Sequence, residues 1–295
     1  MEALKQSVKE LGYFLVAIDP IHVGTGGYRL GSVDNTILRE PHTKVPKIPG
    51  SSISGVVKSF YPYLSGSLEE WECITSDGGC GKENCMICFT FGYSTNGESQ
   101  KGKAQFFDAN IIMFPIFTTI GTRWITTPEI LNNIFGFEIE EPSYEKAFIS
   151  KKPKKDLNFI AVGWLSLNLE EKPNLDSLKE KSSSKEFQSI LDNLVIVNSG
   201  IFPFLVNANL EVRTSTAIDP KTGTVKEGAL FTYEAIPRGT VFSTEVGFFD
   251  YTIFKSHHKS EEAVKRLKDA INLLAVIGLG GMNTRGFGRV KPIER

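Results

Sequence analysis

The sequence has few cysteines, and they are confined to one short segment. Only 4 of the 295 residues are cysteine, and all of them lie between Cys73 and Cys88. Secreted proteins that are stabilised by disulfides usually have cysteines spread along the chain, so this clustering argues against a disulfide framework and favours a metal site.

Long apolar runs and a surplus of one charge are also missing. No run approaches the ~20 apolar residues that a membrane span needs, and the first 20 residues contain no signal-peptide cleavage pattern. The 33 basic and 34 acidic residues give a net charge of −1, which argues against a polybasic protein but not against a local basic groove. We therefore expect a cytoplasmic protein that makes no membrane contact.

The order of predicted elements indicates an α+β fold. Residues 13–19 alternate as a strand does, and 49–64 have apolar residues at helical spacing. Residues 102–124 favour further extended structure. The strongest helix is predicted over 260–278, where apolar residues again recur at helical spacing, and a final strand follows it. This order suits a ferredoxin-like (βαββαβ) core with large insertions, forming a single domain over 1–295.

Two insertions stand out from this pattern. Residues 70–92 contain the cysteines, and residues 199–232 contain two extended arms around the turn residues Asp219 to Gly223. The second pattern predicts a protruding β-hairpin.

The cysteine spacing is typical of a structural metal site. Cys73, Cys80, Cys85 and Cys88 follow the pattern C-x6-C-x4-C-x2-C, and the final C-x2-C pair is a common half of a tetrahedral zinc site. Four thiolates leave no open coordination position, so we expect structural Zn²⁺. The first two spacings are wide, which leaves open that His42 replaces one cysteine, or that the four thiols are simply reduced.

Two glycine-rich stretches offer backbone amides to a polyanion. "HVGTGGYRLGSVDN" includes Gly24, Gly26 and Gly27, and "GLGGMNTRGFGRV" carries Arg285 and Arg289 among its glycines. Glycine lets backbone N–H groups approach phosphates closely. The second stretch follows a helix instead of opening one, so it is neither a dinucleotide fingerprint nor a Walker loop. A tight helix-to-strand turn is the alternative.

Together these stretches resemble a known family. "HVGTGGYRLGSVDNTILREPHTKVPKIPGSSISGVVKS" and "GLGGMNTRGFGRV" are similar to the signatures of the RAMP superfamily of CRISPR effector subunits. "FFDANIIMFPIFTTIGTRWITTP" and "RTSTAIDPKTGTVKEGALFTYEAIPRGTVF" resemble the backbone subunit of type III-B (Cmr) complexes. The resemblance extends from about Tyr13 to Val290, although the cysteine cluster is more reminiscent of type III-A (Csm) backbone subunits.

The resemblance implies a fold, a set of partners and an activity. A palm with a modified RNA-recognition fold would pack head to tail with further copies of itself along a CRISPR guide RNA, beside other Cmr-type subunits. The 199–232 hairpin would be a thumb that crosses the duplex of guide and target single-stranded RNA.

The resemblance also assigns roles to residues. Asp34, which taken alone is more often a turn residue, matches the family's slicing aspartate, with His22 and Glu234 as assisting candidates and weakly bound Mg²⁺ or Mn²⁺. The chain would then be a metal-dependent endoribonuclease, active only in the assembled complex. The expected RNA contacts are Gly24, Gly26, Gly27, Arg29, Lys47, Ser51, Ser52, Lys58, Gly280, Gly281, Arg285, Gly286 and Arg289.

Two other functions remain open at this stage. In one, the chain is a non-catalytic guide-RNA scaffold in which Asp34 only shapes its loop. In the other, it is a zinc-stabilised protein-interaction module without an RNA role.

Overall fold

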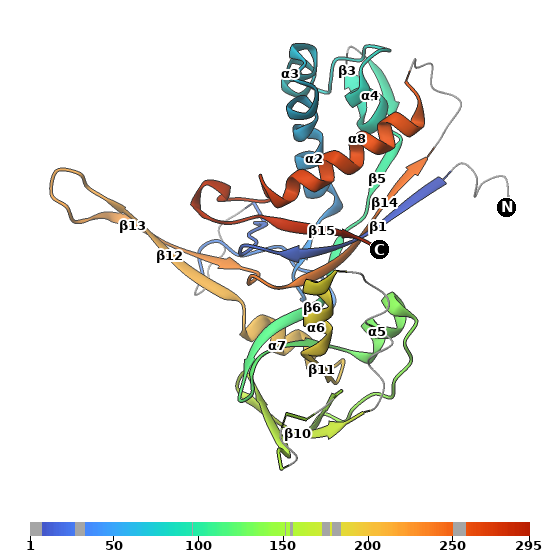
Figure 1. The fold of residues 1–295 in the computed structure, drawn as a ribbon. Coiled ribbons are helices and arrows are strands. Elements are labelled where there is room, and N and C mark those ends of the chain that lie inside the picture. Colours follow the sequence, from blue (N-terminus) through green and yellow to red (C-terminus); the bar gives the residue numbers. More distant parts are fainter. Residues whose placement is uncertain are drawn as a thin grey trace.

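The computed structural model describes residues 8–26, 33–95, 97–150, 152–153, 156–172, 178, 184–249 and 258–295. Most of the strands belong to one large sheet (Figure 1). The strands are β1 (Val8–Ala17), β2 (Lys47–Ile48), β3 (Gly92–Thr95), β4 (Glu98–Lys101), β5 (Ala104–Phe106), β6 (Ala109–Thr118), β7 (Gly121–Thr126), β8 (Lys146–Ile149), β9 (Phe159–Val162), β10 (Leu165–Glu171), β11 (Leu194–Val197), β12 (Glu211–Ile218), β13 (Val225–Ala235), β14 (Val241–Phe249) and β15 (Val290–Glu294).

The helices lie around this sheet and in the segments between its strands. They are α2 (Gly50–Ser65), α3 (Leu68–Thr75), α4 (Met86–Phe91), α5 (Pro128–Phe135), α6 (Lys185–Asp192), α7 (Phe202–Ala208) and α8 (Ser260–Asn272), with short 3₁₀ turns η2 (Leu273–Ala275) and η3 (Asn283–Arg285). The predicted helix over 260–278 therefore ends earlier as an α-helix, because its last turn tightens into η2. Within the described residues, no helix is both long and apolar enough to cross a bilayer.

One end of the sheet is antiparallel. Its order is β15-β1-β14-β6, and β1 pairs with both β14 and β15. Beyond β6 the order continues as β7-β11-β8-β10-β9, in which β7 pairs with β11 in parallel. The chain is thus a mixed α/β protein with one extended sheet.

Residues 13–17 of β1 are buried on both faces of the sheet, which explains why this part of the strand is entirely apolar. Tyr13 and Leu15 face the core that lies beneath α2 and α8, which pack against each other. Phe14 and Val16 face a second core formed with α5 and α6, in which the Phe14 and Phe187 rings stack at 4.8 Å between centroids. Residues i and i+2 of a strand point to the same face, so one strand serves both cores.

The hairpin of β12 and β13 extends out of the molecule, as Figure 1 shows. Its turn follows the sequence expectation, since the Asp219 carboxylate accepts a hydrogen bond from the Lys221 N–H at 2.8 Å. The paired strands cover 211–235, whereas the expected thumb began at residue 199. Residues 202–208 instead form α7, which buries Phe202, Leu205 and Val206 in the body of the protein.

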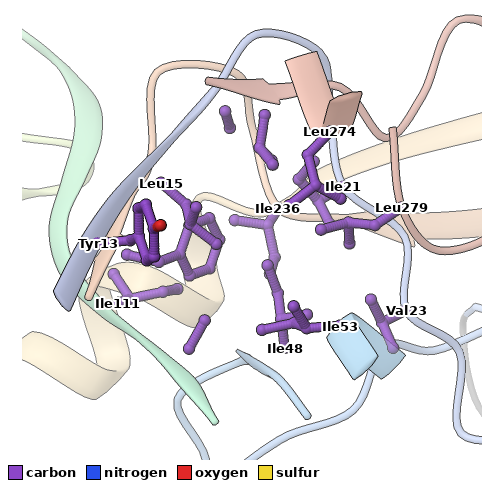
Figure 2. Close-up of a cluster of buried hydrophobic side chains, with 14 of the residues drawn as sticks. Tyr13, Leu15, Ile21, Val23, Ile48, Ile53, Ile111, Ile236, Leu274 and Leu279 are labelled. Atoms are coloured by element: carbon purple, nitrogen blue, oxygen red, sulfur yellow. The ribbon is translucent and has the colours of Figure 1, made fainter. Parts of the chain in front are cut away.

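A compact apolar cluster lies where the N-terminal and C-terminal segments meet (Figure 2). Ile21 and Val23 follow β1, Ile236 follows β13, and Leu274 and Leu279 follow α8. These side chains come from distant parts of the sequence, and their burial fixes the segments that hold the glycines.

Candidate functional site

The two glycine-rich segments lie side by side and are hydrogen-bonded to each other. The Gly281 N–H donates to the His22 carbonyl at 2.8 Å, and the Gly288 N–H donates to the Pro20 carbonyl at 3.0 Å. The residues before Gly26 and the residues after Gly278 therefore form one surface, as the sequence interpretation required.

Glycine is needed at the closest approach. Gly280 has φ +79°, and a Cβ there would lie 2.5 Å from the His22 carbonyl oxygen. Gly24 and Gly281 both lie against the His22 ring. A Cβ on Gly24 would lie 3.2 Å from the ring Nε2, and a Cβ on Gly281 would lie 3.4 Å from the ring Cδ2. Side chains at these positions would separate the two segments or displace the ring. Gly26 and Gly286 also have positive φ but border open space.

Asp34 is half-buried and is held by the hairpin strand β13. Its Oδ2 accepts hydrogen bonds from the Thr232 N–H at 2.8 Å and from the Thr232 hydroxyl at 2.9 Å. These bonds, led by the one from the backbone, hold the pKa of the Asp34 carboxyl below its usual value. The carboxylate is therefore ionised at neutral pH. Among the described residues, none donates a hydrogen bond to its Oδ1.

The residues after Asp34 run alongside β13. The Asn35 N–H donates to the Thr232 carbonyl, and the Glu234 N–H donates to the Asn35 carbonyl, each at 3.0 Å. Glu234 is buried and binds this segment with both carboxylate oxygens, accepting from the Ile37 N–H at 3.1 Å and forming an ion pair with Arg39. Both of its oxygens thus already have donors.

His22 has a defined orientation. Its Nδ1 lies 2.7 Å from the Glu234 carbonyl oxygen, and a carbonyl can only accept, so Nδ1 carries the proton in the neutral ring. The edge of the ring faces Tyr233, at 6.2 Å between centroids. In this tautomer Nε2 is the unprotonated nitrogen and can accept a proton.

The cationic side chains expected to contact RNA differ in whether they already bind a carboxylate. Arg285 is exposed, with its guanidinium 3.3 Å from the Tyr233 hydroxyl. Arg289 forms two hydrogen bonds to the Asp19 carboxylate at 2.6 and 3.0 Å. Lys47 lies 2.6 Å from Glu40 and 2.7 Å from Asp108, and these carboxylates raise the pKa of its amine. Arg289 and Lys47 would have to exchange carboxylates for phosphates.

Of the remaining residues expected to contact RNA, some lie within the described residues and some outside them. Ser51 and Ser52 lie in the first turn of α2, whose Gly50 N–H is bound by Asp108 at 2.8 Å, and Lys58 lies half-buried on the same helix. Gly27 and Arg29 lie outside the described residues. Three residues of the site were not anticipated from the sequence. They are Arg39, Thr232 and Tyr233.

The four cysteines form a second site away from these loops. Their sulfurs all lie within 4.8 Å of one another, with Cys73–Cys85 at 3.5 Å and both Cys73–Cys88 and Cys80–Cys88 at 3.7 Å. A tetrahedral ion with metal–sulfur bonds of ~2.3 Å implies sulfur–sulfur distances of about 3.8 Å. His42 lies in an exposed turn outside this group, and the set of four thiols fits one metal ion.

Hydrogen bonding within the cluster favours one thiolate, at Cys88. Bonds from Cys73 and Cys85 lower the pKa of Cys88 to about 4, whereas bonding to Cys85 and Cys88 raises the pKa of Cys73. The thiolate is the form that binds metal. A bound cation would favour deprotonation of the other sulfurs as well.

Comparison with known proteins gives consistent matches over most of the chain. The family described as the RAMP superfamily matches residues 14–291. The CRISPR system Cmr endoribonuclease Cmr4 of Pyrococcus furiosus is 26% identical over 296 aligned residues, covering 94% of this chain and 92% of that protein.

Solved structures agree on the fold. A chain in the cryo-EM structure of the type III-B Cmr-beta complex bound to cognate target RNA has a TM-score of 0.67 at 18% identity, with 97% of each chain covered. Oligomeric Cmr4 from Pyrococcus furiosus has a TM-score of 0.64 at 22% identity, with 97% of this chain and 98% of that chain covered.

Proposed function

The chain belongs to the RAMP superfamily, and we propose that it is a multi-copy backbone subunit of a type III CRISPR ribonucleoprotein that cleaves target RNA. The observation that carries this proposal is the joint surface of two glycine-rich segments, next to an ionised Asp34 at the base of a protruding hairpin. The named activity and assemblies of the Cmr relatives support it. We place its action in the cytoplasm, where guide and target RNA would meet.

We interpret β15-β1-β14-β6, together with α2 and α8, as a ferredoxin-like palm. The antiparallel order and the two packed helices support this interpretation. The remaining strands are then an extension of the palm, residues 70–92 are the metal-binding insertion, and β12–β13 is the thumb.

A filament explains how a chain of net charge −1 binds RNA. Each copy needs to neutralise only a few phosphates of a long guide. In this proposal Arg285 and the exposed amides near Gly280 and Gly26 contact the sugar–phosphate backbone, and base pairing with the guide supplies sequence recognition. The hairpin would cross the guide–target duplex and unpair one position in each repeat.

The reaction would be an internal transesterification of the target strand. A 2′-oxygen attacks the adjacent phosphorus, the bond to the 5′-oxygen breaks, and the 2′-hydroxyl proton passes to a base while the departing 5′-oxygen takes a proton from water. Products carry 2′,3′-cyclic phosphate and 5′-hydroxyl ends. A divalent cation, when bound, would offset the negative charge on the oxygens of the five-coordinate phosphorus.

This chain's own residues have separate tasks in that scheme. Asp34 would orient the ribose hydroxyl or hold a cation such as Mg²⁺ or Mn²⁺ through its open Oδ1, since its lowered pKa makes it a weak base. In its neutral form His22 has its hydrogen on Nδ1, so that Nε2, beside Gly24, is the nitrogen that can act as an acceptor. Glu234 supports both, through its carbonyl oxygen to His22 and its carboxylate to the segment after Asp34.

We propose structural zinc for the cysteine cluster. Four sulfurs at near-tetrahedral spacing support a closed site with no position for a substrate. The metal would order α3, α4 and the turns between them, and it would take no part in cleavage.

The test is the chemistry and spacing of the products. The complex is assembled with its guide and given complementary target RNA labelled at one end, with and without Mg²⁺. Cuts at regular intervals that yield 2′,3′-cyclic phosphate ends support the proposal. Cuts that leave 3′-hydroxyl ends would show a water nucleophile and overturn this mechanism.

A non-catalytic scaffold is the second candidate, and one observation favours it. Asp34 forms hydrogen bonds of the kind that shape a loop. An assembled complex that binds target RNA and leaves it intact in Mg²⁺ and in Mn²⁺ would select this function. The family match over 14–291 counts against a protein-interaction module without an RNA role.

A further inference from the structure

Thr232 makes an unusually complete set of hydrogen bonds to Asp34. Its N–H and its hydroxyl both donate to the Asp34 Oδ2, and its hydroxyl oxygen accepts from the Asp34 N–H at 3.0 Å. The hydroxyl proton is therefore directed to the carboxylate, and a lone pair is directed to the amide. Both the side chain and the backbone of Asp34 are bound to a single residue.

We propose that Thr232 is the positioning residue of the cleavage site, fixing the Asp34 carboxylate so that Oδ1 faces the RNA. This inference rests on the proposed function, because it assigns a geometric role within the same reaction. Thr232 itself need not touch the RNA.

The Thr232 hydroxyl restricts the rotation of the Asp34 carboxylate more than the backbone N–H alone would. A single donor to Oδ2 leaves the carboxylate free to rotate about its Cβ–Cγ bond. The second donor, at 2.9 Å from the same oxygen, restricts that rotation. A misplacement of about 1 Å can slow a reaction by about 10²-fold, so the second hydrogen bond has a measurable kinetic consequence.

The position of Thr232 also links the site to the hairpin. Thr232 belongs to β13 and pairs with Thr214 of β12. The strand that extends away from the body as one arm of the hairpin thus provides the donors for Asp34 at its base (Figure 1). A shift of β13 when the hairpin contacts a duplex would move the carboxylate with it.

The experiment compares three variants in the complex assembled with its guide. Thr232→Val removes the hydroxyl at nearly constant volume and keeps the backbone N–H. Thr232→Ser keeps the hydroxyl. Thr122→Val makes the same change at an exposed position of β7, outside the hairpin, where no described hydrogen bond reaches Asp34. The readouts are the single-turnover cleavage rate at saturating complex, the Kd for target RNA and the thermal midpoint of the chain.

We expect Thr232→Val to lower the single-turnover rate by about 10- to 100-fold with the Kd for target RNA unchanged. Thr232→Ser should restore most of the rate, and Thr122→Val should cleave like the unmodified chain. A purely structural role would lower the thermal midpoint and the amount of assembled complex while leaving the rate of assembled complexes intact.

Asp34→Asn separates the positioning role of Thr232 from the proposed function of the chain. If it abolishes cleavage while Thr232→Val cleaves at the normal rate, the positioning role is wrong and the proposed function stands. If Asp34→Asn cleaves normally, the catalytic assignment of Asp34 fails and the role of Thr232 fails with it. A loss confined to target binding in Thr232→Val would also overturn the inference.

Discussion

The cysteine cluster and the Asp34 site are built in opposite ways. The cluster takes all four of its side chains from residues 73–88. The Asp34 site combines the segment after β1, the base of the hairpin and the loop before β15, so that Asp34 and its partner Thr232 are 198 residues apart in the chain. The first site depends on local turns and helices, and the second depends on the whole sheet being in place.

This difference predicts how each site responds to damage. Substitutions in the cluster should destabilise the insertion and leave the RNA cleavage rate unchanged, because the cluster lies outside the surface formed by the glycine-rich segments. Changes at the contacts between distant segments should disturb several functional residues at once.

The largest effect is expected for Asp34→Asn. The substitution keeps the size of the side chain and removes its negative charge, so we expect slicing to fall by about 10³-fold or more. Guide binding and assembly should remain, because Asn can still accept from Thr232. Cleavage gels and native mass spectrometry of the same preparation measure both. Cleavage at the original rate would leave Asp34 with only a loop-shaping role.

The paired change Cys85→Ser with Cys88→Ser should release the metal. We expect zinc content to fall by one equivalent per chain and the insertion to become sensitive to protease, with a loss of about 3 kcal/mol or more of stability. Slicing at a permissive temperature should persist. Metal analysis that detects no zinc in the unmodified protein would reject the zinc assignment. If the folded double variant loses slicing, the cluster and the Asp34 site are not independent.

Gly280→Ala tests the contact between the two glycine-rich segments. The new Cβ would lie 2.5 Å from the His22 carbonyl oxygen at φ +79°, so we expect a loss of about 3 kcal/mol from strain and displacement. Gly286→Ala is the matched control, since it has φ +80° but borders open space, and should lose about 1–2 kcal/mol. Denaturant unfolding of both variants gives the comparison. Equal losses would show that the close approach is unimportant.

The smallest effect concerns pH. Hydrogen bonds from Thr232 depress the pKa of Asp34 in the folded chain, so the ionised carboxylate contributes stability above its unfolded pKa, near 4. This contribution is lost as the pH falls through the folded value. The difference in unfolding midpoint between the unmodified chain and Asp34→Asn should therefore be constant from pH 7 to 5 and shrink below about pH 4. A difference that grows on acidification would contradict the sign of the shift.

The same contrast explains what could be predicted from the sequence. Cysteine spacing is a local signal, and it identified a cluster that the fold does assemble. The helical periodicity of 260–278, most of which forms α8, and the turn over 219–223 are local as well. Each of these depends on residues that are close together in the chain, so the sequence contains the necessary information.

Contacts between distant segments could not be predicted in that way. Thr232 resembled any other polar residue in an alternating strand, and its bond to Asp34 depends on how β13 meets the segment after β1. Lys47 was expected to face RNA phosphates, yet it lies between Glu40 and Asp108. Ion pairs across a fold need three-dimensional proximity, which periodicity does not encode.

The local origin of the cysteine cluster bears on when the chain can bind a metal ion during its synthesis. All four thiols stay within 16 residues of chain even when the sheet is lost, so an unfolded or nascent chain can retain its ion. Metal that is bound by both states stabilises the native one by less than its full affinity. A freshly synthesised chain would therefore be able to take up a metal ion at these thiols before its C-terminal third leaves the ribosome.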